Sequence, residues 1–578
     1  MNWSLRPQYA DLKASLASIL GVSEITAQTL INRGITKEAD AQRFLKPDLQ
    51  HLHDPFLMAD MDKGVRRIIH AIKANERISI CGDYDADGVT STALLIRFFR
   101  TLGIEVFYHI PNRLKEGYGM HKNAIDELRK LKTDLIITVD NGINAFEEVE
   151  YAKSLGIDVV VTDHHEPRDE LPLAAAVINI KRRDSKFPFR QLAGVGVVFN
   201  LIIALRQKLR EEGFFKTRPE PRLKDLLDIV AVGTVADVVP LLDENRIFVR
   251  FGLEELKKST NKGLNALKLA SGLEPHQIDA TSIAFRIAPR INAAGRLDDP
   301  TLGVRLLITE DSEEAAQIAQ KLHELNSKRQ SIEEGISKEA AASILADDSL
   351  MTGLGTVVYK EGWHRGVIGI VASRLAEANR KPTVVVSVEG DIAHGSARSV
   401  GDYNIIEALA GCSRLLTSFG GHTHAAGLKL ETLNIEQFKR EFNKIVSATL
   451  KNIDREDSVL IDAELTSEDV TEELIGELEM MEPFGRENPE PIFCIRDMKV
   501  AGARIVGEKH LKLRMTDNMM VLNAIGFGMG HHNVAEDDIL DVAFVPQKDT
   551  WRGNGAVQLK LKDLSLRAKR SNLHNSVM

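Results

Sequence analysis

The sequence is poor in cysteine and in aromatic residues, and it has no long apolar run. Its cysteines, Cys81, Cys412 and Cys494, are odd in number and far apart, which argues against a disulfide framework and for a reducing compartment. No apolar run reaches the length of about 18 residues that crosses a bilayer, and the start, MNWSLRPQYADLK, has no apolar segment typical of a signal peptide. We therefore expect a cytoplasmic protein without a membrane partner.

Net charge and chain length exclude fewer classes of protein than these absences do. The 74 lysines and arginines and the 83 aspartates and glutamates give a formal net charge of −9. Taken alone, that balance disfavours a nucleic-acid partner, because phosphate binding requires lysine and arginine. Acids that bind metal contribute to the count, however, and a basic groove can be local, so net charge excludes little. At 578 residues the chain exceeds one hydrophobic core, and we expect three or four domains.

From about residue 77 the apolar pattern alternates between short strands and helices. The expected strands are RISIC, IEVFYHI (104–110), DLIITV (134–139), IDVVVT (157–162) and AAVINI (175–180). Helical stretches separate most of them, and two longer helical stretches follow at 194–211 and 223–236. That alternation is typical of a parallel sheet covered by helices on both faces.

The second half of the chain predicts three further parts. Residues 311–345 lack proline and carry apolar residues every three or four places, so they predict one helix of roughly 50 Å that connects two lobes. Residues 353–450 combine strand-like GTVVY and PTVVVSV with helical GVIGIVASRLAEANR, which predicts a second α/β region. Residues 458–565 contain short strand-like runs spaced by turns, which predict a small β-barrel. The expected strands there are KHLKLRM, VLNAIGFG, DVAFVPQ and AVQLKLKDL.

The stretch ISICGDYDADGVT (78–90) places three aspartates at alternate positions after an apolar run. D-x-D-x-D-G also opens an EF-hand calcium loop, but the twelfth position, counted from Asp83, needs a bidentate glutamate and holds Leu94. The segment before the aspartates is typical of a buried strand, and the segment after them of a helix. We therefore reject a calcium sensor. We interpret Asp83 as a turn former or helix cap, and Asp85 and Asp87 as candidate metal ligands.

Other polar side chains follow later strands of the same predicted sheet. Asp140 follows DLIITV, the triplet Asp163, His164 and His165 follows IDVVVT, and Asp237 interrupts an apolar helix in VGTVADVVP. In open α/β sheets, ligand sites lie beyond the carboxyl ends of the strands, so we expect these side chains to meet at one edge. Clustered carboxylates stay ionised only beside a cation, and carboxylates with imidazole suit Mn²⁺ or Mg²⁺. A pair of such ions can generate a hydroxide and stabilise a phosphoryl oxyanion.

Together these motifs resemble the DHH phosphoesterase family, named for the triplet that here is Asp163-His164-His165. GDYDADG, VDNG, TDHH and GTVADVVP are similar to successive motifs of that family, and GGHTHAAG (420–427) is similar to the signature of its DHH-associated second domain. The length, the connector helix and the C-terminal barrel narrow the resemblance to the branch that degrades single-stranded DNA from 5′ to 3′. The resemblance covers about residues 50 to 560.

The resemblance implies an α/β fold in which a parallel-sheet DHH domain is joined by a long helix to a second α/β domain, followed by an OB-like β-barrel. The expected parts are an N-terminal helical accessory segment (1–50), the DHH domain (51–305), the connector helix (306–350), the DHH-associated domain (351–455), the OB-like single-strand-binding domain (456–565) and a disordered tail (566–578). The barrel region is not rich in aromatic residues, so we expect it to bind by charge more than by stacking. The candidates are Arg504, Lys509, Lys512 and Arg514.

The same resemblance assigns roles to the clustered acids and histidines. Asp85 and Asp140 would hold one ion, and Asp87, Asp140, His164 and Asp237 would hold the other. Many family members carry a histidine ligand four places before the first of these aspartates, where this chain has Cys81, so one or two ions are expected. His165 would act on the phosphate or position the attacking water, and Asp163 would orient an adjacent histidine.

Arginines that follow other strands are the expected contacts to the substrate, because the planar fork of arginine donates two hydrogen bonds to phosphate. The resemblance assigns Arg113 in IPNRLKEGYG, with Ser396 and Arg398 in GSARS, to a terminal 5′ phosphate; both segments are expected to follow strands. Arg290, Asn292 and Arg296 in APRINAAGR are expected on the DNA backbone. In GGHTHAAG the glycines let backbone amides approach a phosphate, which His422 would contact.

These expectations combine into one function. The resemblance implies an exonuclease that degrades single-stranded DNA in the 5′–3′ direction to mononucleotides, by attack of metal-activated water on the phosphodiester, in DNA repair and recombination. It also implies a monomer, with single-strand-binding protein and a repair helicase as partners. Family phosphodiesterases for very short oligonucleotides or cyclic dinucleotides generally lack the barrel, and a family pyrophosphatase would be shorter still. An inactive DHH scaffold would have lost the metal acids, which are in place here.

Overall fold

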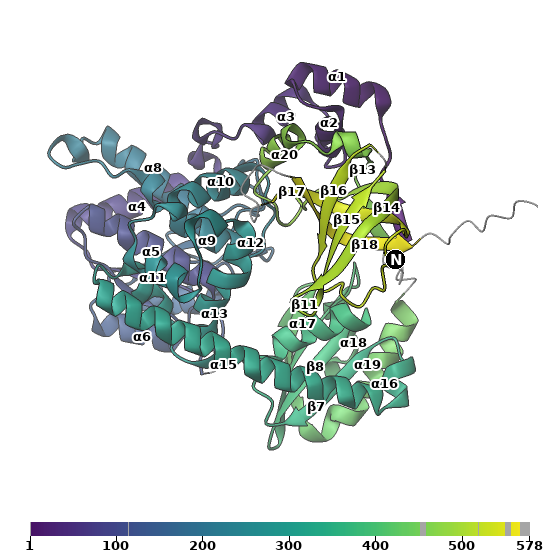
Figure 1. Ribbon diagram of the computed structural model, residues 1–578. Coiled ribbons are helices and arrows are strands. Elements are labelled where there is room, and N and C mark those ends of the chain that lie inside the picture. The colour runs from purple at the N-terminus through teal and green to yellow at the C-terminus, as the bar shows by residue number, and fades with distance from the viewer. Residues whose placement is uncertain (1, 114, 451–457, 518, 550–556, 567–578) are drawn as a thin grey trace, which may run out of the picture. The chain divides into compact units, whose positions relative to one another are not determined.

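The computed structural model describes the chain except residues 1, 114, 451–457, 518, 550–556 and 567–578. The chain divides into two compact units. The α/β unit contains His53–Val239 and Phe251–Arg455, and the barrel unit contains Met1–Leu52, Pro240–Arg250 and Glu456–Met578. Figure 1 shows the helices and strands of both units.

A five-stranded parallel sheet forms the centre of the first part of the α/β unit, as the sequence predicts. The strands lie in the order β3-β2-β4-β5-β6, and each neighbouring pair is parallel. They are β2 (Ile78–Cys81), β3 (Phe107–His109), β4 (Leu135–Val139), β5 (Asp158–Asp163) and β6 (Ala176–Asn179). The apolar strand β4 is buried along its whole length, because helices cover the sheet on both faces.

Helices follow and separate these strands. They are α4 (Met61–Ala74), α5 (Ala86–Thr101), α6 (Lys122–Lys130), α7 (Phe146–Ser154), α8 (Gly194–Glu211), α9 (Leu227–Ala236), α10 (Asp243–Lys257), α11 (Lys262–Ala270), α12 (Ala280–Ser282), α13 (Ala288–Leu297) and α14 (Thr301–Ile308). α5 packs against α8, α9 and α14. The prediction that Asp237 interrupts a helix is wrong: α9 ends at Ala236, because Val238 takes a left-handed backbone conformation (φ 58°).

One long helix, α15 (Ser312–Leu345), follows, in agreement with the prediction for residues 311–345. Asp311 caps its N-terminus by accepting hydrogen bonds from two backbone N–H groups of the first turn. Its buried face is mostly apolar but includes Arg329 and Glu333, which form an ion pair. Glu333 also pairs with Arg374 of α17 (Ile368–Asn379), at 2.7 Å. The helix is therefore tied to the second α/β region by charge as well as by packing.

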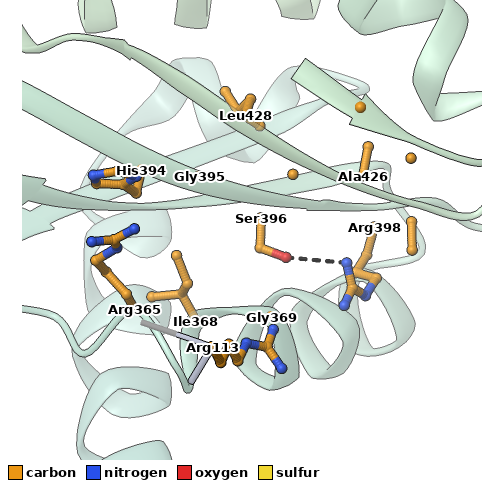
Figure 2. A pocket seen from close by; sticks show the side chains of 14 residues that line it. Arg113, Arg365, Ile368, Gly369, His394, Gly395, Ser396, Arg398, Ala426 and Leu428 are labelled. Carbon is orange, nitrogen blue, oxygen red and sulfur yellow. Dashed lines mark hydrogen bonds between the residues drawn. The ribbon is translucent and has the colours of Figure 1, made fainter. Parts of the chain in front are cut away.

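The second α/β region is built on a mixed sheet in the order β10-β11-β9-β8-β7, in which only β7 and β8 are parallel neighbours. Its remaining elements are α16 (Asp348–Thr352), β7 (Thr356–Glu361), β8 (Thr383–Glu389), β9 (Ile392–Arg398), α18 (Ile405–Gly411), β10 (Ser418–Gly421), β11 (Ala425–Glu431) and α19 (Ile435–Thr449). The prediction that GSARS follows a strand is wrong. Residues 395–398 lie inside β9, because they pair with both β8 and β11. Figure 2 shows side chains of β9 that line a pocket.

The barrel unit contains a closed β-barrel together with the N-terminal helices. The barrel strands follow the order β14-β15-β16-β18-β17, and pairing of β14 with β17 closes the barrel, which confirms the predicted OB-like fold. The elements are β1 (Asn2–Leu5), α1 (Ala10–Leu20), α2 (Glu24–Ile31), α3 (Glu38–Leu45), β12 (Ser458–Ile461), β13 (Ala463–Glu464), α20 (Glu472–Glu479), β14 (Phe493–Val506), β15 (His510–Thr516), β16 (Val521–Gly526), β17 (Ile539–Lys548) and β18 (Val557–Leu566). β1 pairs with β12 in parallel. Residues 567–578 of the predicted tail lie outside the described residues.

Within the described chain, none of the helices taken singly has the length and apolar character needed to cross a membrane. α1 and α2, which meet at an angle of 114°, satisfy both requirements only when they are counted together.

Candidate metal and phosphate site

The candidate metal ligands lie at the carboxyl ends of neighbouring strands. Asp85 follows β2, Asp140 follows β4, and Asp163 ends β5. β4 lies between β2 and β5 in the parallel sheet, so the three strand ends bring these side chains to one edge. Asp140 has a left-handed backbone conformation (φ 61°), and Gly142 follows with φ 107°, so the chain turns sharply where β4 ends.

Backbone N–H groups hold Asp85 and Asp87 in fixed orientations. Asp85 caps α5, and its Oδ1 accepts hydrogen bonds from two N–H groups of the first turn, each at 3.1 Å. The two oxygens of Asp87 accept from the backbone N–H groups of Gly194 (2.7 Å) and Val195 (2.8 Å), at the start of α8. A Cβ on Gly194 would lie 2.8 Å from Asp140 Oδ1. Glycine at this position therefore lets α8 approach both carboxylates.

His164 faces the carboxylates with an unprotonated nitrogen. Its Nδ1 donates a hydrogen bond to the carbonyl oxygen of Leu192 (3.0 Å). Burial, followed by the neighbouring His165, lowers the pKa of His164 to about 3, so the ring is neutral near pH 7 and Nε2 carries a lone pair. That Nε2 lies 3.1 Å from Asp140 Oδ1 and 3.9 Å from Asp87 Oδ2. A lone pair directed at carboxylate oxygens is the arrangement of a metal ligand.

Burial and neighbouring carboxylates raise the pKa of Asp87 and of Asp140. Burial, followed by Asp85, raises the pKa of Asp87 to about 7. Burial, followed by Asp87 and Asp85, holds the pKa of Asp140 well above its ordinary value. Asp140 Oδ1 is buried and accepts no hydrogen bond from the described residues. An orphaned buried oxygen among carboxylates and imidazole fits a divalent cation such as Mn²⁺ or Mg²⁺.

The ligand atoms form three overlapping groups, and within each group they lie within 4.8 Å of one another. The groups are Asp140, His164 and His165; Asp87, His164 and Asp237; and Asp83, Asp85 and Asp140. Asp140 belongs to two of these groups, which is the position of a bridging carboxylate. His164 also belongs to two groups, but the single lone pair on its Nε2 can bind only one ion. Asp237 reaches the cluster from the end of α9, where its Oδ2 lies 3.7 Å from His164 Nδ1.

Asp83 joins this cluster, although its sequence pattern is that of a turn or cap. Asp85 provides the cap of α5, and Asp83 is 1% exposed beside Asp85 and Asp140. Burial, followed by Asp85, raises the pKa of Asp83 well above its ordinary value. Cys81, at the end of β2, is also buried, and burial raises the pKa of its thiol to about 12. A protonated thiol is a poor metal ligand, whereas the Asp83 carboxylate offers oxygen donors at the same edge.

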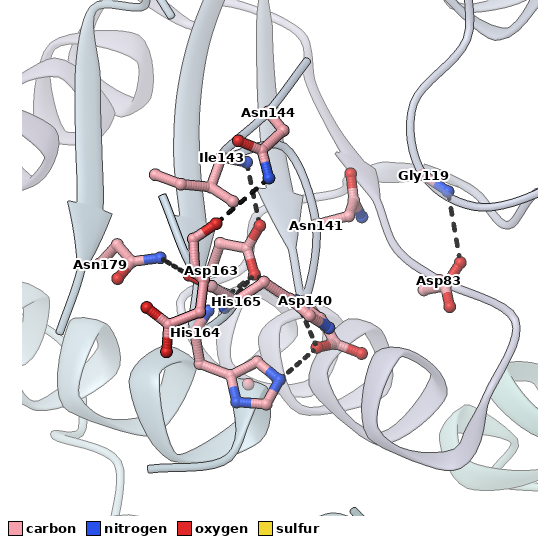
Figure 3. Close-up of polar contacts among 12 residues, drawn as sticks. Asp83, Gly119, Asp140, Asn141, Ile143, Asn144, Asp163, His164, His165 and Asn179 are labelled. Atoms are coloured by element: carbon pink, nitrogen blue, oxygen red, sulfur yellow. Dashed lines mark hydrogen bonds and ion pairs between the residues drawn. The ribbon is translucent and has the colours of Figure 1, made fainter. Parts of the chain in front are cut away.

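Asp163 orients His165, and Figure 3 shows both side chains with the residues around them. Its Oδ1 accepts a hydrogen bond from His165 Nδ1 (2.7 Å), and its Oδ2 accepts from the backbone N–H of Ile143 (2.9 Å). Burial alone would raise the pKa of Asp163, but the hydrogen bond from His165 and the charges of His165 and His164 lower it to about 2. Asp163 in turn raises the pKa of His165 against the effect of burial. Nε2 of His165 is thereby left for another partner.

Tyr118 is a neighbour of this pair that the sequence analysis missed. Its hydroxyl donates a hydrogen bond to the carbonyl oxygen of Asp140 (2.9 Å) and lies 3.1 Å from His165 Nδ1. Its ring meets the ring of His165 edge-on. Gly117 and Gly119, on either side, have φ values of 93° and 85°. The sequence signal that could have identified Tyr118 is therefore G-Y-G, in which a bulky residue lies between two glycines that permit a left-handed backbone conformation.

A cationic pocket of about 400 Å³ lies in the same unit (Figure 2). Arg113, Ser396 and Arg398, the predicted phosphate contacts, all line it. Arg398 donates hydrogen bonds to Ser396 Oγ and to Ser373 Oγ, both at 3.1 Å. The guanidinium of Arg113 lies 5.1 Å from the centre of the Tyr84 ring, in the GDYDADG loop. Burial, followed by Arg113, lowers the pKa of Arg398, so a bound anion would stabilise both guanidinium groups.

Asn292 and Arg296, on α13, are engaged with the protein and do not line that pocket. Oδ1 of Asn292 accepts a hydrogen bond from the backbone N–H of Ala86 (2.8 Å), so Asn292 supports the start of α5. Arg296 donates to the carbonyl oxygen of Gly366 (3.1 Å), and burial lowers its pKa to about 10. Both residues therefore hold backbone that borders the two charged sites.

Arg290 and His422 are also placed outside the pocket lining. Arg290 lies on α13, where its Nη2 is 3.1 Å from His323 Nδ1. His422 follows β10 in the turn that leads to β11, and its backbone N–H donates to the carbonyl oxygen of Ala425 (2.9 Å). The glycine-rich segment GGHTHAAG is therefore a hairpin whose glycines border the pocket.

Comparison with known proteins gives the class first. The chain matches the DHH family, N-terminal domain, over residues 77–234 and the DHHA1 domain over residues 352–450. With the acids and histidines at the strand ends of a parallel sheet, this defines a DHH-type phosphoesterase. A third match, to the RecJ OB domain, covers residues 461–563, which form the barrel.

Whole-chain comparisons then give the family. The single-stranded-DNA-specific exonuclease RecJ of Salmonella typhimurium is 36% identical over 576 residues, which are 97% of this chain and 98% of that protein. The structure of RecJ in complex with Mn²⁺ from Thermus thermophilus matches with a TM-score of 0.82 at 30% identity, over 98% of this chain and 79% of that chain. The Mg²⁺ complex of RecJ from the same organism matches with a TM-score of 0.76 at 28% identity, over 97% and 78%. The chain belongs to the RecJ family.

Proposed function

We propose that this protein is a metal-dependent exonuclease that degrades single-stranded DNA from the 5′ end to mononucleotides. The observation that carries the proposal is the lone-pair nitrogen of His164, which faces the orphaned oxygen of Asp140 at 3.1 Å among buried carboxylates. Such an arrangement binds divalent cations, and cation-assisted attack by water is the chemistry of phosphodiester hydrolysis. Membership in the RecJ family supports an exonuclease and a single-stranded substrate.

The donor set fits one or two ions of Mn²⁺ or Mg²⁺. When bound, such ions supply charge neutralisation at the phosphate and activation of water. We assign Asp85 and Asp140, together with Asp83, to one ion. We assign Asp87, Asp140, His164 and Asp237 to the other.

His165 and Asp163 act on the reacting phosphate in this proposal. Asp163 keeps the proton on Nδ1 of His165 and fixes the ring, so Nε2 is directed by a rigid partner. Nε2 then contacts a phosphate oxygen or positions the attacking water. The proton released from water passes to the leaving 3′ oxygen of the terminal nucleotide.

Arg113, Ser396 and Arg398 provide the end recognition that a 5′–3′ exonuclease requires. They line one pocket in the same unit as the acid cluster, and two of the three are guanidinium groups suited to a terminal phosphate. A 5′ phosphate held there fixes the position of the first nucleotide. Cleavage at the next phosphodiester then releases one mononucleotide per turnover.

Other polar and basic residues provide contacts to the rest of the strand. On α13 and in the hairpin between β10 and β11, the proposed contacts are Arg290, Asn292, Arg296 and His422. On the barrel, Arg504 and Lys512 are paired across β14 and β15, and Arg514 lies two residues further on the same face. Lys509 precedes β15. These side chains favour binding by charge, which is sequence-independent.

We propose DNA repair and recombination as the setting, with single-strand-binding protein and a repair helicase as partners. We also propose a monomeric, cytoplasmic protein with the six parts given above. Membership in a family named for exonucleases specific for single-stranded DNA supports single-stranded DNA as the substrate, and the setting is proposed from that substrate. Light scattering would test the monomer, and pull-down with each purified partner would test the contacts.

Single-stranded DNA of some tens of nucleotides, labelled in turn at the 5′ and 3′ ends, tests the activity in Mn²⁺ or Mg²⁺. A blunt duplex and a dinucleotide run alongside. We expect mononucleotide release from the 5′ end of the single strand, with the duplex spared. Cleavage of the dinucleotide alone would instead indicate a small-substrate phosphodiesterase, and binding without cleavage would indicate a scaffold.

A further inference from the structure

The cationic pocket extends beyond the residues assigned to the 5′ phosphate. His394, Ser396 and Arg398 are alternate residues of β9 and all line the pocket, so their side chains share one face. At about 6.6 Å per two residues, the face extends about 13 Å from Arg398 to His394. Figure 2 shows Ser396 between these two side chains, with Arg365 close to His394. The lined face is therefore longer than one phosphate needs.

Glycines leave the floor of this pocket open. Gly427 of β11 lies opposite Ser396, and Gly420 of β10 lies opposite Gly427. A Cβ added to either glycine would meet no other atom within 4 Å, so the space above them is available to a ligand. A Cβ on Gly369, at the start of α17, would instead lie 3.1 Å from Ser396 Oγ. The helix therefore closes the pocket on the opposite side.

The far end of the pocket has its own positive charge. Lys429 is the partner of His394 across β9 and β11, so the two side chains share a face. Arg365 lies at the same end, and its Nη1 is 3.6 Å from Oε2 of Glu389. Glu389 engages one side of the guanidinium, and the remaining N–H groups of the fork can donate to another anion. Arg365 and Lys429 are positive and Glu389 is negative, so this end of the pocket keeps a net positive charge when His394 is neutral.

We propose that Arg365 and His394 form a second phosphate position, so that the protein accepts single strands with a 5′-triphosphate as well as a 5′-monophosphate. This inference rests on the proposed function and names a further substrate class for it. The phosphate next to the sugar occupies the position of Ser396 and Arg398, and the outer phosphates extend along β9 toward Arg365. Lys429 adds long-range attraction at the same end.

The reaction on such a strand balances without a further reactant. Water attacks the phosphorus of the phosphodiester that follows the first nucleotide, a new P–O bond forms, and the bond to the 3′ oxygen breaks. The proton from water passes to that 3′ oxygen. The first product is a nucleoside 5′-triphosphate with a 3′ hydroxyl, and the shortened strand begins with a 5′-monophosphate.

Equilibrium binding without divalent ions tests the second position independently of cleavage. The probes are single-stranded DNAs with a 3′ fluorophore and a 5′ hydroxyl, monophosphate or triphosphate. The variants are Arg365→Ala, His394→Ala and the matched control Arg414→Ala, which removes an exposed arginine that is 3.7 Å from Glu441 in the same region. We expect the triphosphate strand to bind more tightly than the monophosphate strand in the parent and the control. Arg365→Ala should reduce that advantage about tenfold, with monophosphate affinity within about twofold of the parent.

Two results would overturn the inference. One is triphosphate binding no tighter than monophosphate binding in the parent, and the other is an equal loss for both strands in Arg365→Ala. Cleavage in Mn²⁺ adds a product test, in which a nucleoside triphosphate must be the first product. Cleavage of the monophosphate strand alone would contradict only this inference. If neither strand is cleaved, the proposed function fails, and the binding comparison still decides whether the second position exists.

Discussion

The two charged sites of the α/β unit are built on different parts of a strand. The acid cluster lies at the C-terminal ends of β2, β4 and β5, where each strand brings its last residues to one edge. The cationic pocket lies on the face of β9, where alternate side chains point the same way. Strand-end residues can be recognised from their order along the chain. Strand-face residues emerge only when pairing and register are known.

The two sites also differ in how their charges are held. Asp87 and Asp140 are buried, and backbone N–H groups of α8 fix Asp87 before any ligand binds. Like charges held this way require a cation. Arg113 and Arg398 are half-buried beside open glycines, which leaves room for an anionic strand end. The comparison predicts that changes in the first site abolish turnover, whereas changes in the second alter substrate preference.

The largest effect is expected from Asp140→Asn. Asparagine keeps the shape of the side chain and tolerates the left-handed backbone, but it lacks the charge shared by two ligand groups. Turnover should fall more than about 1,000-fold while the circular dichroism spectrum is retained. Asp169→Ala, at an exposed carboxylate, is the control. Parent-like turnover by Asp140→Asn would remove the acid cluster from the mechanism.

A smaller and selective effect is expected from Arg398→Ala. The loss of the fork should lower kcat/KM about tenfold on 5′-phosphorylated strands, because a charge-assisted contact is lost. Strands with a 5′ hydroxyl should change by less than about twofold. Arg398→Lys keeps the charge without the fork. Its kcat/KM on 5′-phosphorylated strands should lie between the values of the parent and of Arg398→Ala. Equal slowing of both strands would show that Arg398 does not recognise the end.

A stability effect is expected in a chelating buffer. The pKa of Asp87 is about 7 in the folded protein, against an ordinary value of 3.8, so folding favours its protonated form. Its contribution to stability is therefore fully present below about pH 4 and is lost as pH rises through about 7. Over that range the Tm of the parent should fall more steeply with pH than the Tm of Asp87→Asn. Added Mn²⁺ should make the two curves of Tm against pH parallel. Parallel Tm curves in chelator would contradict the burial of an Asp87 carboxylate whose charge no cation neutralises.

The smallest effect is expected from Tyr118→Phe. The variant keeps the ring but removes the hydroxyl that contacts Asp140 and lies beside His165. We expect kcat to fall about threefold to tenfold with KM unchanged, because a single hydrogen bond contributes about 1 kcal/mol. Tyr118→Ala, which also removes the ring, should cost more. A change in KM alone would place Tyr118 in substrate binding.

Much of the fold could be predicted because its signals are local. Each signal lies within one segment of the chain. These signals are the apolar runs of β2, β4, β5 and β6, and the regular apolar spacing without proline in α15. β14 was missed, because its second half is exposed and a bulge near Gly502 breaks the alternation of inward and outward residues. β1 was also missed, since its partner β12 lies near the other end of the chain.

The candidate site divides in the same way. Asp85, Asp140 and His164 follow apolar runs, so their meeting at one edge could be predicted from parallel-sheet topology. Asp83 could not be separated from a turn former, because the pattern does not reveal its burial. Arg365 and His394 come from the segment that leads into α17 and from β9, so only the packing of helix on sheet brings them together.

The most direct test is a calorimetric Mn²⁺ titration of the parent and Asp140→Asn, with single-turnover cleavage of 5′-phosphorylated single-stranded DNA by the same preparations. The acid cluster predicts one or two bound ions in the parent, and affinity at least about tenfold weaker in Asp140→Asn, since a buried carboxylate ligand is lost. Cleavage should fall together with Mn²⁺ affinity. Unchanged Mn²⁺ binding and unchanged cleavage in Asp140→Asn would contradict the claim that this cluster holds the ions that cleavage requires.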